Sequence, residues 1–248
     1  MPDETKNQND PAILAMFESG AHFGYSRSKR HPSMKEVMFG VKNRVEIFDL
    51  EKTKIFLDKA KNFIETVGAS GKHVLFVGGK SEAKSSIKEQ AEALGAPYVA
   101  GRWLGGTLTN FGQIKTRINK LVDLKDKRAK GELGKYTKKE RLLIDRDITD
   151  LEDMFGGLLP MANLPGAVFV IDSKKEKTVV AEAKSLRIPV VALMNSDCDL
   201  TEAEYPIPGN DTSSSSIKFF VSQIAGALKM GKTRMVAPVS TPLMAGKK

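Results

Sequence analysis

Apolar runs and amphipathic segments alternate through the central part of the chain. Four short apolar runs, each bounded by turn-forming residues, are typical of buried parallel strands: HVLFVGG (73–79), PYVAG (97–101), AVFVID (167–172) and IPVVALMN (188–195). Between them, SEAKSSIKEQAEALG predicts a helix that ends at Gly95, and KKEKTVVAEAKSL predicts another. Strands that alternate with helices predict an α/β domain whose parallel sheet is covered on both faces.

Further elements are expected on either side of this alternation. Asp10 followed by Pro11 predicts the start of a helix that ends at Gly20, and EVMFG and RVEIFDL predict two short strands around a turn. Asp49 can cap a following helix, whose apolar face is expected to carry Ile55, Phe56, Ala60, Phe63 and Ile64. A last helix, about 213–230, has one apolar face with Ile217, Phe220, Val221, Ile224 and Leu228.

The apolar spacing changes between residues 110 and 156. Steps of three and four, the spacing of a coiled-coil pair, separate Ile114, Ile118 and Leu121, and then Ile144, Ile148, Leu151 and Phe155. Thr137 and Glu140 in TKKE form a capping box that starts the second helix. We therefore predict an antiparallel coiled-coil hairpin over 110–156, inserted in an α/β domain made of 10–109 and 157–230. Residues 1–9 are expected to be disordered, and 231–248 to form a basic flexible tail.

Composition narrows the class of protein. With 248 residues, 41% of them hydrophobic, the chain can bury a sizeable core. The net charge of +9 indicates a polyanionic partner, nucleic acid before a membrane surface. A single cysteine excludes an intrachain disulfide framework and suits the reducing cytoplasm. No apolar run approaches the ~20 residues of a membrane span, and the polar start of the chain does not resemble a signal peptide.

Basic residues gather in two regions. SRSKRHPSMK (26–35) is an irregular basic stretch of the kind that suits folded RNA, and the outer faces of the predicted hairpin carry many lysines and arginines among interleaved acids. Any one hairpin lysine could equally belong to a solvated helix face. In GRWLGGTLTN, we expect Trp103 to pack while Arg102 and the polar residues face outward.

A ligand-binding or catalytic site of the sheet would be expected beyond the carboxyl ends of its strands. FVGGKSEAK could hold an anion at a helix start or form only a tight turn. MNSDCDLTEAEYPIPGND could hold a cation or form only a polar loop. The three histidines stand far apart, no catalytic constellation is evident, and Cys198 is expected to be inert. We therefore expect no enzyme activity, no cofactor and no metal.

GALKMGKT (226–233) matches the phosphate-binding pattern G-x-x-x-x-G-K-T. A phosphate loop needs a strand before it and a helix after it, whereas here a helical pattern precedes it and a proline-containing segment follows. Gly231 is therefore expected to end the last helix, and no nucleotide is expected to bind. The alternatives kept open are a nucleotide-binding α/β enzyme and a binder of small molecules at the strand ends.

Several stretches resemble the bacterial type of the second protein of the small ribosomal subunit, the ribosomal protein "S-two" family. They are AHFGYSRSKRHPSMKEVMFGVKNRVEIFDLEKT, VLFVGGK, GAPYVAGRWLGGTLTNFGQIKTRI, YTKKE, GGLLPMANLPGAVFVIDSKKEKTVVAEAKSLRIPVVAL and YPIPGND, in the family order. The resemblance implies a flavodoxin-like parallel sheet with an inserted coiled-coil hairpin. It further implies a cytoplasmic, structural constituent of the small ribosomal subunit that binds 16S ribosomal RNA and helps to dock the messenger-binding "S-one" protein.

The expected RNA-binding residues come from the basic stretches and the polar loop. They are Arg27, Lys29, Arg30, His31, Lys35, Lys42, Arg44, Arg102, Thr107, Thr109, Asn110, Lys115, Arg117, Lys138 and Lys139. The chain departs from the family pattern at Tyr25, where most members have a second histidine, and at LMNSDCDL and TSSSSIKF. The last two departures argue against carrying over an ion or RNA contact to those positions.

Overall fold

A five-stranded parallel sheet forms the centre of the protein, for which a computed structural model describes residues 10–236. Its strands are β4 (Val74–Val77), β5 (Tyr98–Val99), β6 (Ala167–Ile171), β7 (Val190–Met194) and β8 (Tyr205–Pro208). Their order, β5-β4-β6-β7-β8, is the flavodoxin-like order, so the predicted fold class is confirmed. The four predicted strands are present, while β8 was not predicted. It contains two prolines and lies at the edge of the sheet, where a strand tolerates them.

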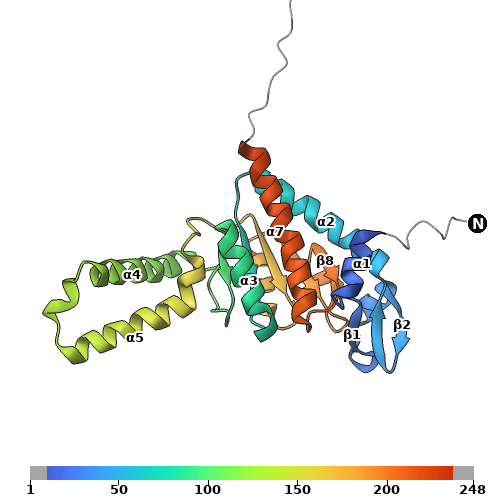
Figure 1. Cartoon of the computed structure of the whole chain (residues 1–248), viewed down its shortest axis with the longest axis horizontal. Helices are drawn as coiled ribbons and strands as arrows, with labels where there is room; N and C mark the ends of the chain where they lie inside the picture. The colour runs from blue at the N-terminus through green and yellow to red at the C-terminus, as the bar shows by residue number, and fades with distance from the viewer. Residues whose placement is uncertain (1–9, 237–248) are drawn as a thin grey trace, which may run out of the picture.

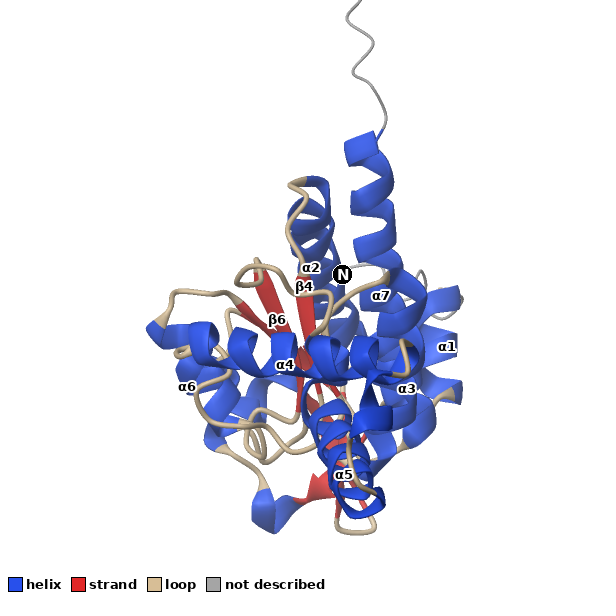
Figure 2. Ribbon diagram, turned by 90° about the vertical axis from the view of Figure 1, so that its left-hand side faces the viewer, coloured by secondary structure: helices blue, strands red, loops and turns tan. Residues whose placement is uncertain are grey.

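Helices cover both faces of the sheet (Figure 2). On one face lie α2 (Leu50–Ala69), α3 (Ser81–Leu94) and α7 (Ser214–Val236), which pack on Phe76 and Phe169. On the other face, α6 (Lys177–Ser185) packs beside β7, in a core cluster that also contains Leu75 and Val77 of β4. Because successive strand residues point to opposite faces, strands buried on both sides are apolar throughout, as the sequence pattern indicates.

Two glycines set the crossing of α2 and α7. A Cβ added at Gly231 would overlap the carbonyl oxygen of Glu65, and one added at Gly68 would lie 2.9 Å from the Leu228 carbonyl oxygen. The prediction that Gly231 ends the last helix is wrong, because α7 continues through it to Val236. Residues 231–236 therefore belong to the helix, and the rest of the predicted tail, like the predicted disordered residues 1–9, lies outside the described residues.

A small antiparallel sheet lies at one end of the molecule, beside α1 (Figure 1). Its strands are β1 (Phe23–Ser26), β2 (Met38–Lys42) and β3 (Val45–Phe48), in the order β1-β3-β2, and two short helices, η1 (Arg27–Lys29) and η2 (Pro32–Val37), connect β1 to β2. The capped start of α1 (Pro11–Glu18) and the β2–β3 pair are confirmed, whereas β1 was not predicted. Ile55, expected on the apolar face of α2, is 56% exposed, since the buried face of that helix is centred on Leu57 and Ile64.

Two long helices project from the opposite end of the molecule (Figure 1). They are α4 (Phe111–Ala129) and α5 (Lys138–Phe155), antiparallel and joined by η3 (Glu132–Lys135), and η4 (Gly156–Leu158) leads back to the sheet. The predicted apolar rows face one another, and the Thr137–Glu140 capping box is present. This helical pair is therefore in place, while its supercoiling stays a prediction. No helix within residues 10–236 is long and apolar enough to cross a membrane.

Candidate nucleic-acid interface

An ion cluster fills the carboxyl edge of the sheet, where folds of this class bind ligands. The Lys80 ammonium follows β4 and lies 2.8 Å from Asp172 Oδ2, after β6, and 2.7 Å from Asp211 Oδ2, after β8. Burial alone would lower the pKa of Lys80, but the two carboxylates outweigh it and hold that pKa well above its ordinary value. The lysine is therefore engaged within the chain.

The segment from Tyr25 to His31 covers the carboxyl edge of the sheet. The Tyr25 backbone N–H donates to Ser196 Oγ at 3.0 Å, and the His31 backbone N–H donates to the Ser196 carbonyl at 2.8 Å. The Asn195 amide donates to Asp211 Oδ1 at 2.7 Å, which ties the loop after β7 to the ion cluster. The strand ends are thus packed with the protein's own side chains.

The glycine turn after β4 holds an anion that belongs to the chain itself. The Gly79 N–H donates to Glu176 Oε1 at 3.1 Å, and a Cβ at Gly79 would collide with that carboxylate. Burial raises the pKa of Glu176, and the hydrogen bond from Gly79 offsets part of that rise. The turn therefore accommodates an internal carboxylate at the position considered for a ligand's anion.

The acidic loop 197–204 has internal partners for several of its carboxylates. Asp197 pairs with Lys174 at 2.9 Å, Asp199 caps η5 (Leu200–Glu202), and Glu204 accepts from the Val190 N–H at 2.8 Å. Within residues 10–236 no group of three or more potential ligand side chains could hold a metal ion. Burial raises the pKa of the Cys198 thiol to about 12, as expected for an inert cysteine.

GALKMGKT lies inside α7, so its backbone N–H groups are committed to the helix. The Lys232 ammonium donates to the Leu94 carbonyl at 2.9 Å, at the C-terminal end of α3. The helical context contradicts a phosphate-binding loop at this position.

Basic side chains of the small sheet form the first exposed cationic surface, the N-terminal basic patch of Arg27, Lys29, Lys42 and Arg44. Pairing of β1 with β3 brings η1 beside the β2–β3 turn, where the Arg27 N–H donates to the Arg44 carbonyl at 3.3 Å. Of the other residues predicted nearby, Lys35 is exposed, Arg30 binds the buried Glu46 carboxylate at 3.1 Å, and His31 hydrogen-bonds Ser33.

The helical pair carries the second cationic surface, and its charge is uneven. Residues 127–141, here called the hairpin tip, contain seven basic and two acidic residues, whereas residues 142–156 contain one basic and five acidic residues. Three cations pair across the helices: Lys120 with Asp147, Lys125 with Glu152, and Arg128 with Asp145. The predicted Lys138 and Lys139 lie on the tip, while the predicted Lys115 and Arg117 lie near the base of α4.

The loop between β5 and α4 is organised by one carboxylate, whose role was not predicted from the sequence. Glu182 Oε1 accepts from Trp103 Nε1 at 3.0 Å and from the Gly106 N–H at 2.8 Å. Glu182 Oε2 accepts from the Leu108 N–H at 3.0 Å, the Thr109 N–H at 3.2 Å and the Thr109 hydroxyl at 3.3 Å. An acid on the buried face of the helical segment KTVVAEAKS was the available signal.

The predicted residues of this loop differ in their exposure. Trp103 packs, as expected. Thr107 is buried and its hydroxyl donates to the Leu104 carbonyl at 2.6 Å, so it faces inward and not outward as expected. Arg102, Thr109 and Asn110 are exposed, and Asn110 precedes α4 without a capping side-chain hydrogen bond.

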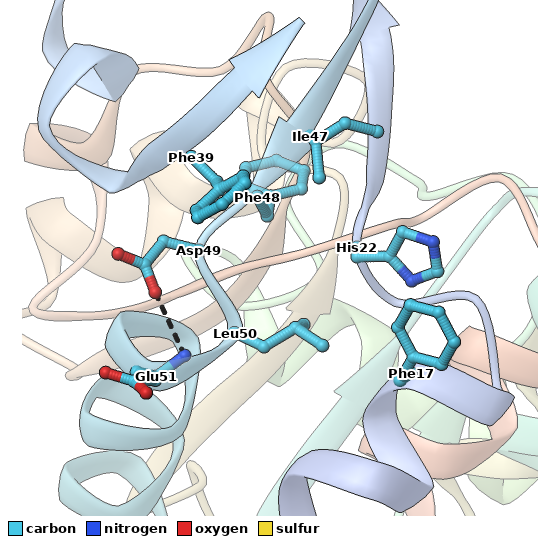
Figure 3. A pocket seen from close by; sticks show the side chains of 8 residues that line it. All are labelled: Phe17, His22, Phe39, Ile47, Phe48, Asp49, Leu50 and Glu51. Atoms are coloured by element: carbon cyan, nitrogen blue, oxygen red, sulfur yellow. Dashed lines mark hydrogen bonds between the residues drawn. The ribbon is translucent and has the colours of Figure 1, made fainter. Parts of the chain in front are cut away.

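Aromatic side chains surround a hollow of about 400 Å³ between α1 and the small sheet (Figure 3). Phe39 on β2 is 81% exposed and Phe17 on α1 is 59% exposed, and Phe17 stacks on His22 with ring centroids 4.6 Å apart. Asp49 and Glu51 lie at its other side (Figure 3). A group of exposed aromatic side chains around a hollow is typical of a surface that binds another protein.

Comparison with known proteins adds independent information. A family model described as "Ribosomal protein S2" matches residues 16–231. Small ribosomal subunit protein uS2 of Roseiflexus sp. (strain RS-1) is 44% identical over 223 residues, which cover 90% of this chain and 85% of that protein. The uS2 protein of Dehalococcoides mccartyi (strain CBDB1) is 42% identical over 216 residues, covering 87% and 88%. That of Geotalea uraniireducens (strain Rf4) is 43% identical over 216 residues, covering 87% and 84%.

Proposed function

Because the chain belongs to the ribosomal protein S2 family, we propose that it is a structural protein of the small ribosomal subunit that binds 16S ribosomal RNA at two separate surfaces. The observation that supports this proposal most is the position of the N-terminal basic patch and the hairpin tip at opposite ends of the molecule (Figure 1). A rigid sheet domain between two cationic ends can fix the distance between two RNA segments.

The closed carboxyl edge agrees with a structural role. Lys80 and Glu176 occupy the positions that a phosphate-binding or metal-dependent enzyme of this fold class would use for its ligand. The net charge of +9 favours a polyanion as the partner.

Salt dependence tests the RNA proposal. Removing one cation that binds a phosphate should reduce the slope of log affinity against log salt by about 0.9, if duplex RNA behaves like B-DNA. Arg27→Gln with Arg44→Gln removes charge from the N-terminal basic patch, and Lys138→Gln with Lys139→Gln removes it from the hairpin tip. Each pair should weaken binding to a 16S ribosomal RNA transcript and reduce the slope by about 1.8.

The matched control removes the same charge from elsewhere on the surface, with Lys59→Gln on α2 and Lys184→Gln on α6. It should bind with the parent slope. Parent-like slopes for both test pairs would contradict the proposal, because the RNA would then be bound elsewhere or not at all.

We also propose that the aromatic hollow takes part in docking the messenger-binding "S-one" protein. Phe39 and Phe17 offer aromatic area that residues 10–236 leave exposed, next to the acidic Glu51. Phe39→Ala should weaken retention of that protein on small subunits, while Leu186→Ala, which truncates an apolar side chain 36% exposed just after α6, should not. Equal retention by the two variants would argue against docking at this hollow.

A further inference from the structure

A cleft of about 850 Å³ separates α3 from the base of α5. Its walls are one side of α3, the segment from Tyr98 to Leu104, and residues 152–159 where α5 turns into η4. The volume lies within the range of roughly 300–1,000 Å³ that small ligands occupy in proteins. Of its lining residues, only Arg102 was among the expected RNA-binding residues.

Three basic and three acidic side chains line the cleft, and two of the basic ones are available to an anion. Lys84, Lys88 and Arg102 are exposed beside it. Lys88 lies 4.0 Å from Glu92, whereas within residues 10–236 neither Lys84 nor Arg102 takes part in an ion pair. Two of the three acids of the lining are already engaged. Glu92 accepts from the Tyr98 hydroxyl at 2.7 Å, and Glu152 accepts from Lys125 at 2.6 Å, which lowers the pKa of Glu152.

An aromatic ring held in place lines the same cleft. The Tyr98 side chain is half-buried, its hydroxyl is bound to Glu92, and Gly157 lies so close that a Cβ there would come within 2.9 Å of the ring. An ordered ring beside exposed cations is how proteins bind unpaired bases, since the base stacks on the ring while the cations contact its phosphates. Bases inside a duplex stay stacked on one another and cannot enter such a cleft.

We propose that the α3–α5 cleft binds an unpaired nucleotide of ribosomal RNA, with Lys84 and Arg102 at its phosphates and Tyr98 against its base. The inference rests on the proposed function, because it assumes that the chain binds ribosomal RNA. It adds a site that reads single-stranded RNA to two surfaces that contact RNA through charge.

Gly101 allows the cleft to be blocked without a change of charge. It lines the cleft, and a Cβ added there meets no atom within 4 Å, so Gly101→Leu should fold and fill the space. Gly105→Leu is the matched control, because that position also has open space, belongs to the same loop and does not line the cleft. Fluorescence of Trp103, the single tryptophan, reports that the neighbouring loop is intact in each variant.

The measurement compares a labelled single-stranded oligoadenylate with a labelled RNA duplex, using the full-length protein. Gly101→Leu should weaken binding of the oligoadenylate about tenfold and leave the duplex affinity unchanged. Lys84→Gln and Arg102→Gln should each weaken binding of the oligoadenylate and reduce its salt slope by about 0.7.

Three results would overturn the inference. One is an unchanged oligoadenylate affinity in Gly101→Leu, and another is an equal decrease on strand and duplex, which would indicate unspecific electrostatic binding. The third is unchanged RNA affinity with impaired incorporation into small subunits, which would assign the cleft to a protein neighbour. If the parent protein bound neither RNA, the proposed function itself would fail, which is a distinguishable outcome.

Discussion

Replacing Glu182 by Gln is expected to destabilise the loop that carries Arg102, because one carboxylate accepts five hydrogen bonds there. Glutamine keeps one acceptor oxygen and turns the other into an amide donor. Whichever way the amide is placed, at least two of the loop's donors then face it without an acceptor. Glu182 is only 8% exposed, so water replaces these bonds poorly.

The magnitude follows from the number of hydrogen bonds that the substitution removes. A hydrogen bond to a charged group contributes about 1.5–3 kcal/mol, so removing two costs about 3 kcal/mol or more in the free energy of unfolding. For a protein of 248 residues, that corresponds to a decrease in Tm of about 6–12 °C. The assay is urea unfolding followed by Trp103 fluorescence, which reports on this loop because Trp103 donates directly to Glu182.

The same carboxylate predicts a pH dependence. Burial tends to raise the pKa of Glu182, but hydrogen bonds from Trp103, Gly106, Thr109 and Leu108 outweigh it, so the pKa in the folded protein is lowered. Its contribution to stability is therefore complete above the pKa of an unfolded glutamate, about 4.3, and is lost as the pH falls through the lower folded value. The difference between the parent and Glu182→Gln should thus be constant near pH 7 and shrink in acid.

Glu89→Gln is the control for this experiment. Glu89 lies on the exposed face of α3, 3.9 Å from Lys218, with both side chains more than 60% exposed, so the change in stability should be small. A Glu182→Gln protein with a free energy of unfolding within about 0.5 kcal/mol of the parent would refute the reasoning, because surface substitutions alone produce changes of that size.

Three further predictions concern the packing of the sheet domain. Gly231→Ala should lower the free energy of unfolding by about 2 kcal/mol, because α2 leaves no room for a Cβ there. Gly226→Ala in the same helix, where the space is open, should not lower it, and thermal unfolding compares the two variants. Lys80→Met should lower the free energy of unfolding in urea by about 3–5 kcal/mol, since it leaves two buried carboxylates facing each other without a cation. A urea midpoint like that of the parent would show that the ion cluster contributes little to stability. Cys198, whose pKa burial raises to about 12, should resist a thiol reagent at pH 8 in the folded protein and react in urea, so rapid labelling of the native protein would contradict its burial.

Prediction from the sequence succeeded where a local pattern was sufficient and failed where a contact between distant residues decided the outcome. The capping box at Thr137, the cap at Asp10 and the left-handed Gly95 all involve neighbours in the chain, and all are present. β8 was missed because its two prolines argue against a central strand, and only the sheet order shows that it is an edge strand. The local pattern predicts a helix end at Gly231, because nothing nearby in the sequence reveals that α2 crosses there.

The candidate sites show the same division. The sequence shows two basic regions, but only the fold places them at opposite ends of the molecule (Figure 1). It gives Lys80 and Glu176 as ordinary charged residues, and the fold makes them the internal occupants of the sheet's carboxyl edge. Glu182 could not be assigned, because its five donors lie more than 70 residues away in the sequence.

By itself, the sequence determined the α/β class, the inserted helical pair and the family, because alternating apolar patterns, caps and extended motifs are properties of short stretches of chain. Only the tertiary structure decided which charged side chains remain exposed and which are paired inside the protein. The physical reason is that a buried charge must find a partner, and the partner can come from any part of the chain that the fold brings within hydrogen-bonding distance.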